Sequence, residues 1–553
     1  MILTRMSGLG VAVAASLAMI AAGLAPAAQA SALRGPAPAP GGSAASAVTY
    51  YKGTPGVARL LPTRIAVTAG PARPFPRGAR RLPSGHFSTS EAVPRAQASP
   101  ATAATTTSAL VNVNGVSSLD SQVTNYNLKF EPPDQGLCEG NGVVLEAVNS
   151  AYRFYRMNGT SLRGPFNIND LFNVGGKEFT SDPRCWFDPS TQTWFAEILF
   201  LNDTFTAGAQ LIAVHHGTSP LGLWNEYSID TTDLGGRGCP CFADQPRIGM
   251  DQNNLYITAD EFSIQGPQFD GAEMWAIPKA QLVAGAAQIH FEHFAHLQIA
   301  GHVTLAPQPA LTTETPNAEY FLSSLDFAGN GDHRIGVWAL TKRNQVGAGT
   351  AVLSSVVINS EAYANPPKAP QQGSTSTLDS GDDRMQQTEF AGGTVWGEMT
   401  TAVQPAGDST VRAGGAWFQV KPALGPAGIT GATIVRQGYI ASAGRYLLYP
   451  AVQPDAAGNA AAVFTVTSGS MFPSAGYATL TAGGSNFGPP VVAAPGSGPY
   501  FPHSTRWGDY SFAVPDSSSD AAWLATEYIP PLSSQTTNGR QNWGTRLIKV
   551  PLG

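Results

Sequence analysis

The sequence predicts an all-β protein, a seven-bladed β-propeller over residues 109–553, with six or eight blades as alternatives. Short runs of β-branched and aromatic residues alternate with Gly, Pro, Asn and Asp, which is typical of many short strands joined by tight turns. A two-strand pattern also recurs along the chain, and such repeats are typical of propellers. Helical periodicity is nearly absent; residues 276–284 are the best candidate and allow one or two turns.

The recurring pattern is a hairpin. An acid, Pro or Gln leads into a short apolar strand, a turn of Asp, Asn or Gly follows, and a second strand returns. The clear copies begin at Ser181, Asp244, Asp383, Tyr449 and Asp509, and the weaker copies begin at Asp134 and Gln308. Seven copies over about 440 residues correspond to about 63 residues for each unit, which accommodates a four-stranded blade of ~40–50 residues with elaborated loops.

Three segments resemble a group of secreted bacterial β-propeller proteins: EPPDQGLCEGNG at 131–142, CPCFADQP at 239–246 and WGDYS at 507–511. The resemblance implies the propeller fold for the whole folded region and transfers no activity. The turn from Asp188 to Trp194 is also loosely similar to the Asp-box of sialidase-type propellers, S-x-D-x-G-x-T-W. It is one residue longer than that box, lacks the Gly, and has Trp186 in place of the Ser.

The N-terminal residues predict export. Arg5 precedes an uncharged, Ala-, Val- and Leu-rich stretch at residues 8–24, and residues 28–30 (Ala-Gln-Ala) form a small-x-small cleavage site. This is the layout of a secretory signal peptide over residues 1–30. Residues 31–108 are rich in Ala, Pro, Ser, Thr and Gly, so a disordered linker or pro-segment is expected. No later stretch approaches the ~20 apolar residues that cross a bilayer, so a secreted protein without a membrane span is predicted.

The net charge divides at residue 108. Residues 1–108 hold nine Arg, one Lys and one acid (Glu91), a net charge of +9, so the chain total of −6 leaves −15 for residues 109–553. Contacts to nucleic-acid phosphates are made by Lys and Arg, so nucleic acid is not an expected partner of an acidic domain. An extracellular glycan or small molecule is the expected ligand, and a monomer is expected.

Many carboxylates are predicted to gather at one opening. In a blade, the start of the innermost strand and the end of the second strand lie on the same face, next to the central axis. The repeat therefore places five leading acids around this opening: Asp134, Asp182, Asp244, Asp383 and Asp509. The returning strands add further acids, with the last two lying deeper: Asp260, Glu261, Glu527, Glu197 and Glu398.

Three interpretations of these carboxylates are open. Each leading Asp can bond its own backbone amides in an Asx-turn. Several can hold Ca²⁺, the one cofactor candidate, because hard cations prefer oxygen ligands. Two can act as acid and base, or acid and nucleophile, in glycosidic cleavage, which requires them ~5 Å or ~6.5–9.5 Å apart. The candidate catalytic residues are Asp244, Asp260, Glu261, Asp509 and Glu527.

Candidate substrate-binding residues are Asp134, Asp182 and Asp383 together with nearby arginines and aromatic residues. Arginines that converge on the axis suit a carboxylate or sulfate of an acidic sugar. The favoured alternative is that each Arg pairs with an Asp of an adjacent blade and closes the ring. Exposed rings would stack on sugar faces, while buried rings would only pack. These residues are Arg184, Arg247, Arg384, Arg506, Trp507 and Tyr510, with Tyr528 and Trp543 as further aromatic candidates.

The four cysteines predict disulfides, because an even number in an exported protein favours them. Cys138 and Cys185 follow the leading acids of adjacent blades, so a bridge between them is expected. A bridge between Cys239 and Cys241, separated only by Pro240, would be strained and more easily reduced. A zinc site there is disfavoured because the usual two-residue spacing is missing.

The sequence contains no G-x-S-x-G elbow, phosphate loop or dinucleotide fingerprint. Four clustered histidines form no H-E-x-x-H motif and are interpreted as strand and loop residues: His290, His293, His296 and His302. The leading hypothesis is a propeller whose carboxylate-lined face binds a polysaccharide or glycoconjugate, with hydrolysis as an open extension. The alternative is a non-catalytic binding or adhesion module stabilised by Ca²⁺ or by Arg–Asp pairs.

Overall fold

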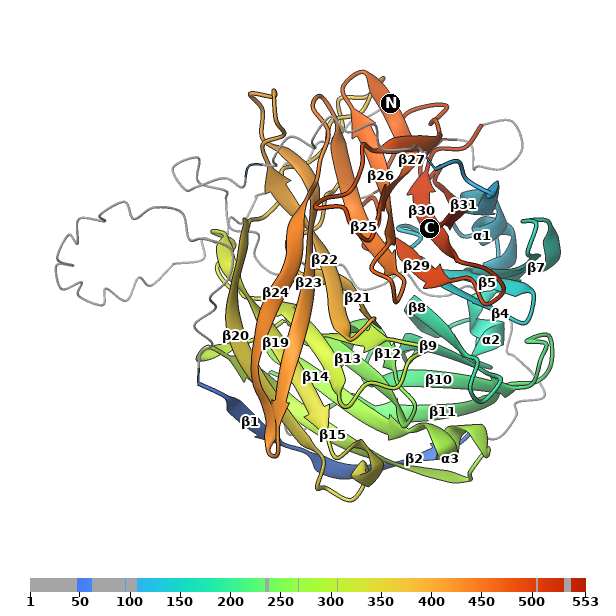
Figure 1. Cartoon of the computed structure of the whole chain (residues 1–553). Coiled ribbons are helices and arrows are strands. Elements are labelled where there is room, and N and C mark those ends of the chain that lie inside the picture. The colour runs from blue at the N-terminus through green and yellow to red at the C-terminus, as the bar shows by residue number, and fades with distance from the viewer. Residues whose placement is uncertain are drawn as a thin grey trace, which may run out of the picture. The chain divides into compact units, whose positions relative to one another are not determined.

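The computed structural model describes residues 47–61, 95, 107–233, 238–266, 268–305, 307–503, 506–531 and 539–553 (Figure 1). Helical structure in them is limited to α1 (Ser118–Thr124), α2 (Ile168–Leu171), α3 (Lys279–Val283) and the 3-10 turn η1 (Arg343–Gln345). The α3 helix confirms the short helix expected at residues 276–284. The predicted signal peptide and most of the predicted linker lie outside the described residues. No helix in the described part of the chain is long and apolar enough to span a membrane.

Consecutive strands pair antiparallel in units of four. Unit 1 consists of β4 (Gly136–Gly140), β5 (Val143–Val148), β6 (Ala151–Arg156) and β7 (Ser161–Asn167). Unit 2 consists of β8 (Phe179–Asp188), β9 (Thr193–Leu201), β10 (Gly208–His216) and β11 (Asn225–Asp230). Unit 3 consists of β12 (Cys241–Met250), β13 (Asn254–Ser263), β14 (Phe269–Pro278) and β15 (Gln288–Ile299), which also pairs with the short β16 (His302–Val303). Unit 4 consists of β17 (Gln308–Leu311), β18 (Glu319–Ser324), β19 (Asp332–Thr341) and β20 (Val352–Tyr363).

The second half of the chain continues the same pattern. Unit 5 consists of β21 (Met385–Ala391), β22 (Thr394–Val403), β23 (Arg412–Gly425) and β24 (Gly428–Ile440). Unit 6 consists of β25 (Tyr446–Pro454), β26 (Ala460–Ser468), β27 (Met471–Leu480) and β28 (Val491–Ala494). Unit 7 consists of β29 (Phe512–Pro515), β30 (Ala521–Tyr528), β31 (Gly544–Pro551) and β3 (Val111–Ser117). The first two strands of each unit are the predicted hairpins.

The units form a closed ring, which is the arrangement of a β-propeller. The first strand of each unit contacts the first strand of the next, and β29 of unit 7 contacts β4 of unit 1. Parallel pairing joins β12 to β17 and β17 to β21, so these inner strands run in the same direction. Unit 7 combines strands from both ends of the propeller, since β3 pairs with β31. The inner strands therefore begin at one common end of the ring and finish at the other.

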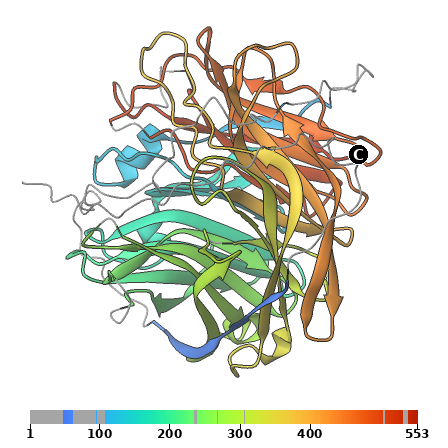
Figure 2. The ribbon, with the colours of Figure 1, turned by 90° about the vertical axis from the view of Figure 1, so that its left-hand side faces the viewer.

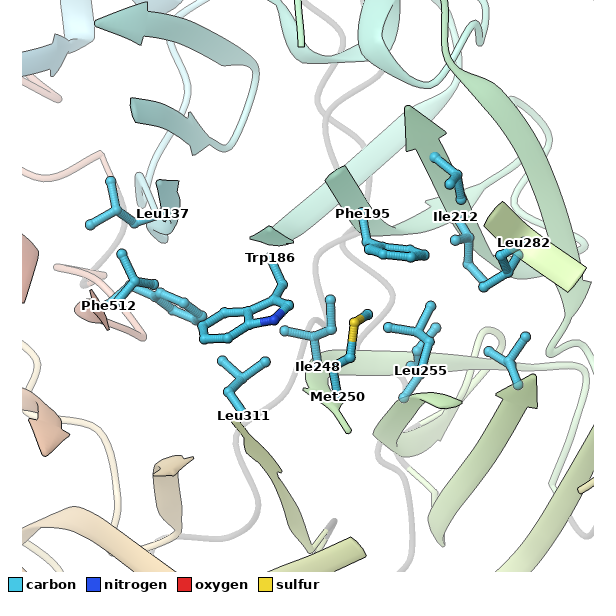
Figure 3. Packing of buried hydrophobic residues seen from close by; sticks show 14 of the residues in the cluster. Leu137, Trp186, Phe195, Ile212, Ile248, Met250, Leu255, Leu282, Leu311 and Phe512 are labelled. Carbon is cyan, nitrogen blue, oxygen red and sulfur yellow. The ribbon is translucent and has the colours of Figure 1, made fainter. Parts of the chain in front are cut away.

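Apolar side chains from several inner strands pack against one another inside the ring (Figure 3). Leu137 of β4, Trp186 of β8, Ile248 of β12, Leu311 of β17 and Phe512 of β29 belong to one buried cluster, and Trp186 is only 2% exposed. At about 25 cal/mol for each Å² of apolar surface removed from water, such contacts favour closure of the ring. They separate the two ends of the ring by an apolar layer.

A segment before the propeller is structured, although residues 31–108 were expected to be a linker. Strands β1 (Thr49–Lys52) and β2 (Thr54–Leu60) follow the outer edges of three units, as the blue segment in Figure 2 shows. β1 pairs with β20 of unit 4, while β2 pairs with β11 of unit 2 and β15 of unit 3. Composition alone did not indicate these strands, because their backbone groups are satisfied by distant edge strands.

The predicted bridge between Cys138 and Cys185 is confirmed, and Cys239 is bonded to Cys241. We expect the double substitution Cys138→Ala with Cys185→Ala to lower the free energy of unfolding by about 4 kcal/mol, because a cross-link restricts the unfolded chain according to the length of the loop it closes. This bridge joins residues 47 apart in the sequence.

The matched control is Cys239→Ala with Cys241→Ala, which removes a bridge between residues 2 apart. Its cost should be much smaller in the same urea-unfolding measurement. Equal losses for the two pairs would contradict the argument from loop length.

Candidate functional site

The inner strands begin with a shared backbone irregularity. In units 2, 3 and 6 the ladder between the first two strands shifts register, and a residue in each shift has a positive φ: 59° at Asp182, 49° at Gln245 and 51° at Tyr449. Each of these residues precedes a proline. Asp134, just before β4, has a φ of 47°. Residues other than Gly rarely adopt such angles, and such outliers concentrate at functional sites.

Four aspartates gather at this end of the ring around one arginine. We call Asp134, Asp182, Asp244, Asp509 and Arg506 the aspartate cluster. The backbone N–H of Asp509 donates to Asp134 Oδ1 at 2.7 Å, and Arg506 forms an ion pair with Asp509. Asp182 and Asp244 both interact electrostatically with Asp509 and Arg506. Three of the aspartates are buried, whereas Asp244 and Arg506 are half-buried, so the cluster reaches solvent through these two residues.

Two amide side chains hold the aspartates in place. Asn149 Nδ2 donates to Asp134 Oδ2 at 2.8 Å, and Asn149 Oδ1 accepts the backbone N–H of Asp182 at 2.7 Å. Gln245 Nε2 donates to Asp509 Oδ2 at 3.4 Å. These contacts join units 1, 2, 3 and 7, so the positions of the carboxylates depend on ring closure.

The cluster favours protonated carboxyl groups. Burial raises the pKa of Asp134 well above its usual value, and the nearby Asp509 and Asp182 raise it further. Burial and then Asp509 raise the pKa of Asp182. Burial and then Asp182 raise the pKa of Asp244 to about 8, although Arg506 opposes this. Carboxylates that share a site disfavour one another's ionisation, and Asp244 is therefore protonated at neutral pH.

Below the cluster, arginines and acids form a buried ladder. Asp260 Oδ2 accepts from Arg247 Nη2 at 3.1 Å and from Arg384 Nη1 at 3.0 Å, and Asp260 is fully buried. Arg384 also donates to Asp382 through Nε at 2.8 Å and through Nη2 at 2.7 Å, and it contacts Gln245. The guanidinium groups of Arg247 and Arg384 are thus held by protein groups, but not by an Asp of an adjacent blade as expected: Arg247 pairs within unit 3, and Arg384 joins unit 5 to unit 3.

Arg184 is held in the same manner. Its Nε donates to Pro246 O at 3.0 Å and its Nη1 to Gln135 O at 3.1 Å, while its guanidinium lies 3.6 Å from the centre of the Tyr510 ring. Tyr510 is only 4% exposed, so it packs on Arg184 instead of offering a sugar-stacking face. The other aromatic candidates are also buried, because neighbouring units cover them: Trp507, Tyr528 and Trp543.

Several predicted acids lie outside the cluster. Asp383 is buried beside Asp326, and Glu261 lies against Glu273, where burial and then Glu273 raise its pKa to about 9. The leading acids of the repeat do not occupy equivalent positions in their strands. Asp244 pairs with Asp260 just before the register shift of the β12–β13 ladder, whereas Asp182 lies within the register shift of the β8–β9 ladder. Glu527 lies beneath the cluster, close enough to Asp134 and Asp509 for their charges to raise its pKa after burial.

Glu197 and Glu398 lie deeper, as expected. Glu197 faces Arg184 across the β8–β9 ladder, and Glu398 Oε1 accepts the backbone N–H of Gln387 at 3.1 Å. Both are buried, and burial raises their pKa values well above the usual range.

Metal-ligating geometry occurs elsewhere in the described residues. The groups of His, Cys, Asp and Glu whose ligand atoms lie within 4.8 Å of one another are found around Glu261 and Asp270, and none includes a residue of the aspartate cluster. This arrangement does not favour the expected Ca²⁺ position among the leading aspartates.

A cavity of about 260 Å³ lies at the opposite end of the ring, and sequence reasoning did not indicate it. It lies where β4, β8, β17 and β29 finish, and Glu139, Trp186, Pro189, Val514 and Asp516 are among its lining residues. Burial is the main reason that the pKa of Glu139 is raised to about 7. No pattern in the sequence distinguishes these positions from ordinary residues at strand ends.

Comparison with known proteins found no matching family model and no matching curated protein. Solved structures similar to this chain include an α-L-arabinanase of Penicillium chrysogenum (TM-score 0.34, 9% identity, covering 80% of this chain and 99% of that chain). They also include the parainfluenza virus 5 hemagglutinin-neuraminidase ectodomain (0.33, 9%, 68% and 81%) and Drosophila Semaphorin 2a (0.39, 7%, 81% and 76%). Neuraminidases are among the similar structures. At these scores the neighbours carry no argument about activity.

We expect Asp260→Asn to lower the free energy of unfolding by about 3–5 kcal/mol, because removing one partner of a buried ion pair leaves an uncompensated charge. Arg247 and Arg384 would both lose this carboxylate. The matched control is Asp332→Asn, whose partner Arg334 is 40% exposed and whose loss should cost less than about 1 kcal/mol. Urea unfolding measures both, and similar costs would contradict the prediction.

Stability should fall as the pH rises from about 4 to about 8. The pKa of Asp244 in the folded protein, about 8, lies above its value near 4 in an unfolded chain, so the folded state binds more protons in this window. Asp244→Asn removes this contribution and should flatten the dependence of the urea midpoint on pH. The exposed Asp520→Asn serves as the control. An unchanged slope in Asp244→Asn would show that another group is responsible.

Proposed function

We propose that the protein is a secreted, seven-bladed β-propeller that binds a polysaccharide or glycoconjugate at the aspartate cluster and hydrolyses a glycosidic bond there. One observation carries the proposal: the half-buried Asp244 has a carboxyl whose pKa is raised to about 8, and it lies in the same cluster as Asp509, which is ion-paired to Arg506. A carboxyl that stays protonated near neutral pH and lies beside a second carboxyl is suited to act as a general acid.

The chemistry assigns one role to each carboxyl. Asp244, protonated at neutral pH, donates its proton to the leaving oxygen as the glycosidic C–O bond breaks. Asp509 accepts a proton from the water whose oxygen bonds to the anomeric carbon. The two proton transfers balance, and the pair is regenerated when a proton returns from Asp509 to Asp244 through solvent. Of the other proposed catalytic residues, Asp260 holds two arginines, Glu261 lies against Glu273, and Glu527 lies beneath the cluster.

The remaining parts of the proposal rest on the fold. The seven units of antiparallel strands support the blade number, and two disulfides support an oxidising compartment. A glycan suits the site because its hydroxyl groups can donate to carboxylates and accept from Arg506. We take the protein to act as a monomer.

A non-catalytic binding module is the second candidate. The observation that favours it is the engagement of Arg184, Arg247 and Arg384 by protein groups, since this makes the ring a structural network. Such a module would need only Asp244, Arg506 and nearby surface to contact the ligand.

Incubation of the purified protein with plant, fungal and bacterial glycans should yield new reducing ends from at least one of them. Because general acid catalysis contributes about 10²–10⁴-fold, Asp244→Asn should lower the rate by at least about 100-fold while glycan binding, measured by calorimetry, is retained. Asp520→Asn is the matched control and should keep the wild-type rate.

Binding without release of reducing ends by the wild-type protein would favour the non-catalytic module. If no glycan in the panel bound or was cleaved, the proposal would be rejected.

A further inference from the structure

Three potential metal ligands converge in unit 3, outside the aspartate cluster. Glu261 lies near the end of β13, Glu273 lies in β14 and His296 lies in β15. One ligand atom of each lies within 4.8 Å of those of the other two. Because β13 pairs with β14 and β14 pairs with β15, three adjacent strands each contribute one side chain.

Register shifts in both of these ladders bring the three side chains close together. The β13–β14 ladder shifts register directly after Glu261, and the β14–β15 ladder shifts on either side of Glu273. His296, opposite the second shift, has a φ of 50°. Bulges of this kind redirect a side chain that would otherwise alternate regularly. As a result, His296 Nδ1 lies 3.4 Å from Glu273 Oε1 and 3.8 Å from Asp270 Oδ2.

Both glutamates are buried, and one carboxyl oxygen of Glu261 is uncompensated by the described residues. Glu261 is 2% exposed and Glu273 is 1% exposed, and Glu261 Oε2 has no hydrogen-bond partner among the described residues. An oxygen of a buried carboxyl that lacks a partner costs free energy, and a second carboxyl beside it raises that cost. A cation bound between the two carboxyl groups would offset the cost of the unpartnered oxygen and the repulsion between the carboxylates. The side chain of His296 is 49% exposed, so this position is open to solvent.

Glu273 is also oriented by neighbours. Its Oε2 lies 2.5 Å from His293 Nε2, and its Oε1 accepts the backbone N–H of His296 at 2.8 Å. The His293 ring stacks on Trp275, with ring centres 5.0 Å apart and planes at 3°. Outer contacts of this type fix the direction of a ligating carboxylate.

We propose that Glu261, Glu273 and His296 bind a divalent first-row transition-metal ion, with Zn²⁺ as the first choice. One imidazole and two carboxylates suit Zn²⁺, which takes four ligands and would add water. Ca²⁺ takes six to eight oxygen ligands and is disfavoured by the imidazole. Cys239 lies nearby, with Sγ 3.7 Å from Asp270 Oδ2, but it is bonded to Cys241 and supplies no thiolate.

The site is separate from the proposed active site. Consecutive side chains of a strand point to opposite faces of its sheet. Asp260 thus binds Arg247 and Arg384, while the next residue, Glu261, faces Glu273. Metal binding and glycan cleavage can therefore be tested independently.

The test uses the full chain after treatment with EDTA and removal of the chelator. Titration with Zn²⁺ in a calorimeter should show one ion bound to each chain, and Zn²⁺ should raise the melting temperature in a manner that EDTA reverses. Co²⁺ should occupy the same site and give visible absorption bands. Glu261→Gln and His296→Ala should each weaken Zn²⁺ binding by at least about ten-fold.

His290→Ala is the matched control, since His290 is an exposed histidine of the same strand and belongs to no potential ligand group within the described part of the chain. It should bind Zn²⁺ as the wild-type protein does. His296→Ala keeps the test decisive if Glu261→Gln fails to fold, because His296 is half exposed. Absence of a Zn²⁺ site in the wild-type protein, or unchanged affinity in His296→Ala, would overturn the proposal.

Discussion

Closure of the ring is the constraint on which the rest of the structure depends. The pairing of β3 with β31 and the contact between β29 and β4 join the two ends of the propeller. Once the ring is closed, the starts of the inner strands must converge at one end. Asp134 and Asp509 lie 375 residues apart in sequence, yet the backbone N–H of one donates to the carboxylate of the other. The crowded carboxylates and their raised pKa values are a consequence of this closure.

Convergence of acids at an axis would be unfavourable without compensation, and the arginines supply it. Arg506 pairs with Asp509, while Arg247 and Arg384 share Asp260. A buried ion pair is weak evidence for stability, because desolvation offsets its attraction. The pairing of arginines with Asp509 and Asp260 instead determines which carboxyl remains available to a ligand. Asp244 is the half-buried aspartate of the cluster, so its proton is the one that solvent or a ligand can reach.

In unit 3, one strand contributes side chains to two separate clusters. Asp260 and Glu261 are neighbours in β13, and the alternation of the strand sends them to opposite faces. One carboxylate joins the arginine ladder, and the other lies against Glu273 and His296. Register shifts in the β13–β14 and β14–β15 ladders also change the direction of individual side chains, while the order of strand pairing stays the same.

The sequence by itself determined the order of strands and the Cys138–Cys185 bridge, because turn residues and apolar strands act locally; Gln308–Leu311 and Glu319–Ser324 are strands as expected. It also indicated that Asp134, Asp182, Asp244 and Asp509 converge. Only the tertiary structure decided which acids stay outside that group, since one residue of register turns a side chain to the other face. It likewise decided that β1 and β2 form and that Trp507 is buried, because pairing and burial there depend on segments hundreds of residues away.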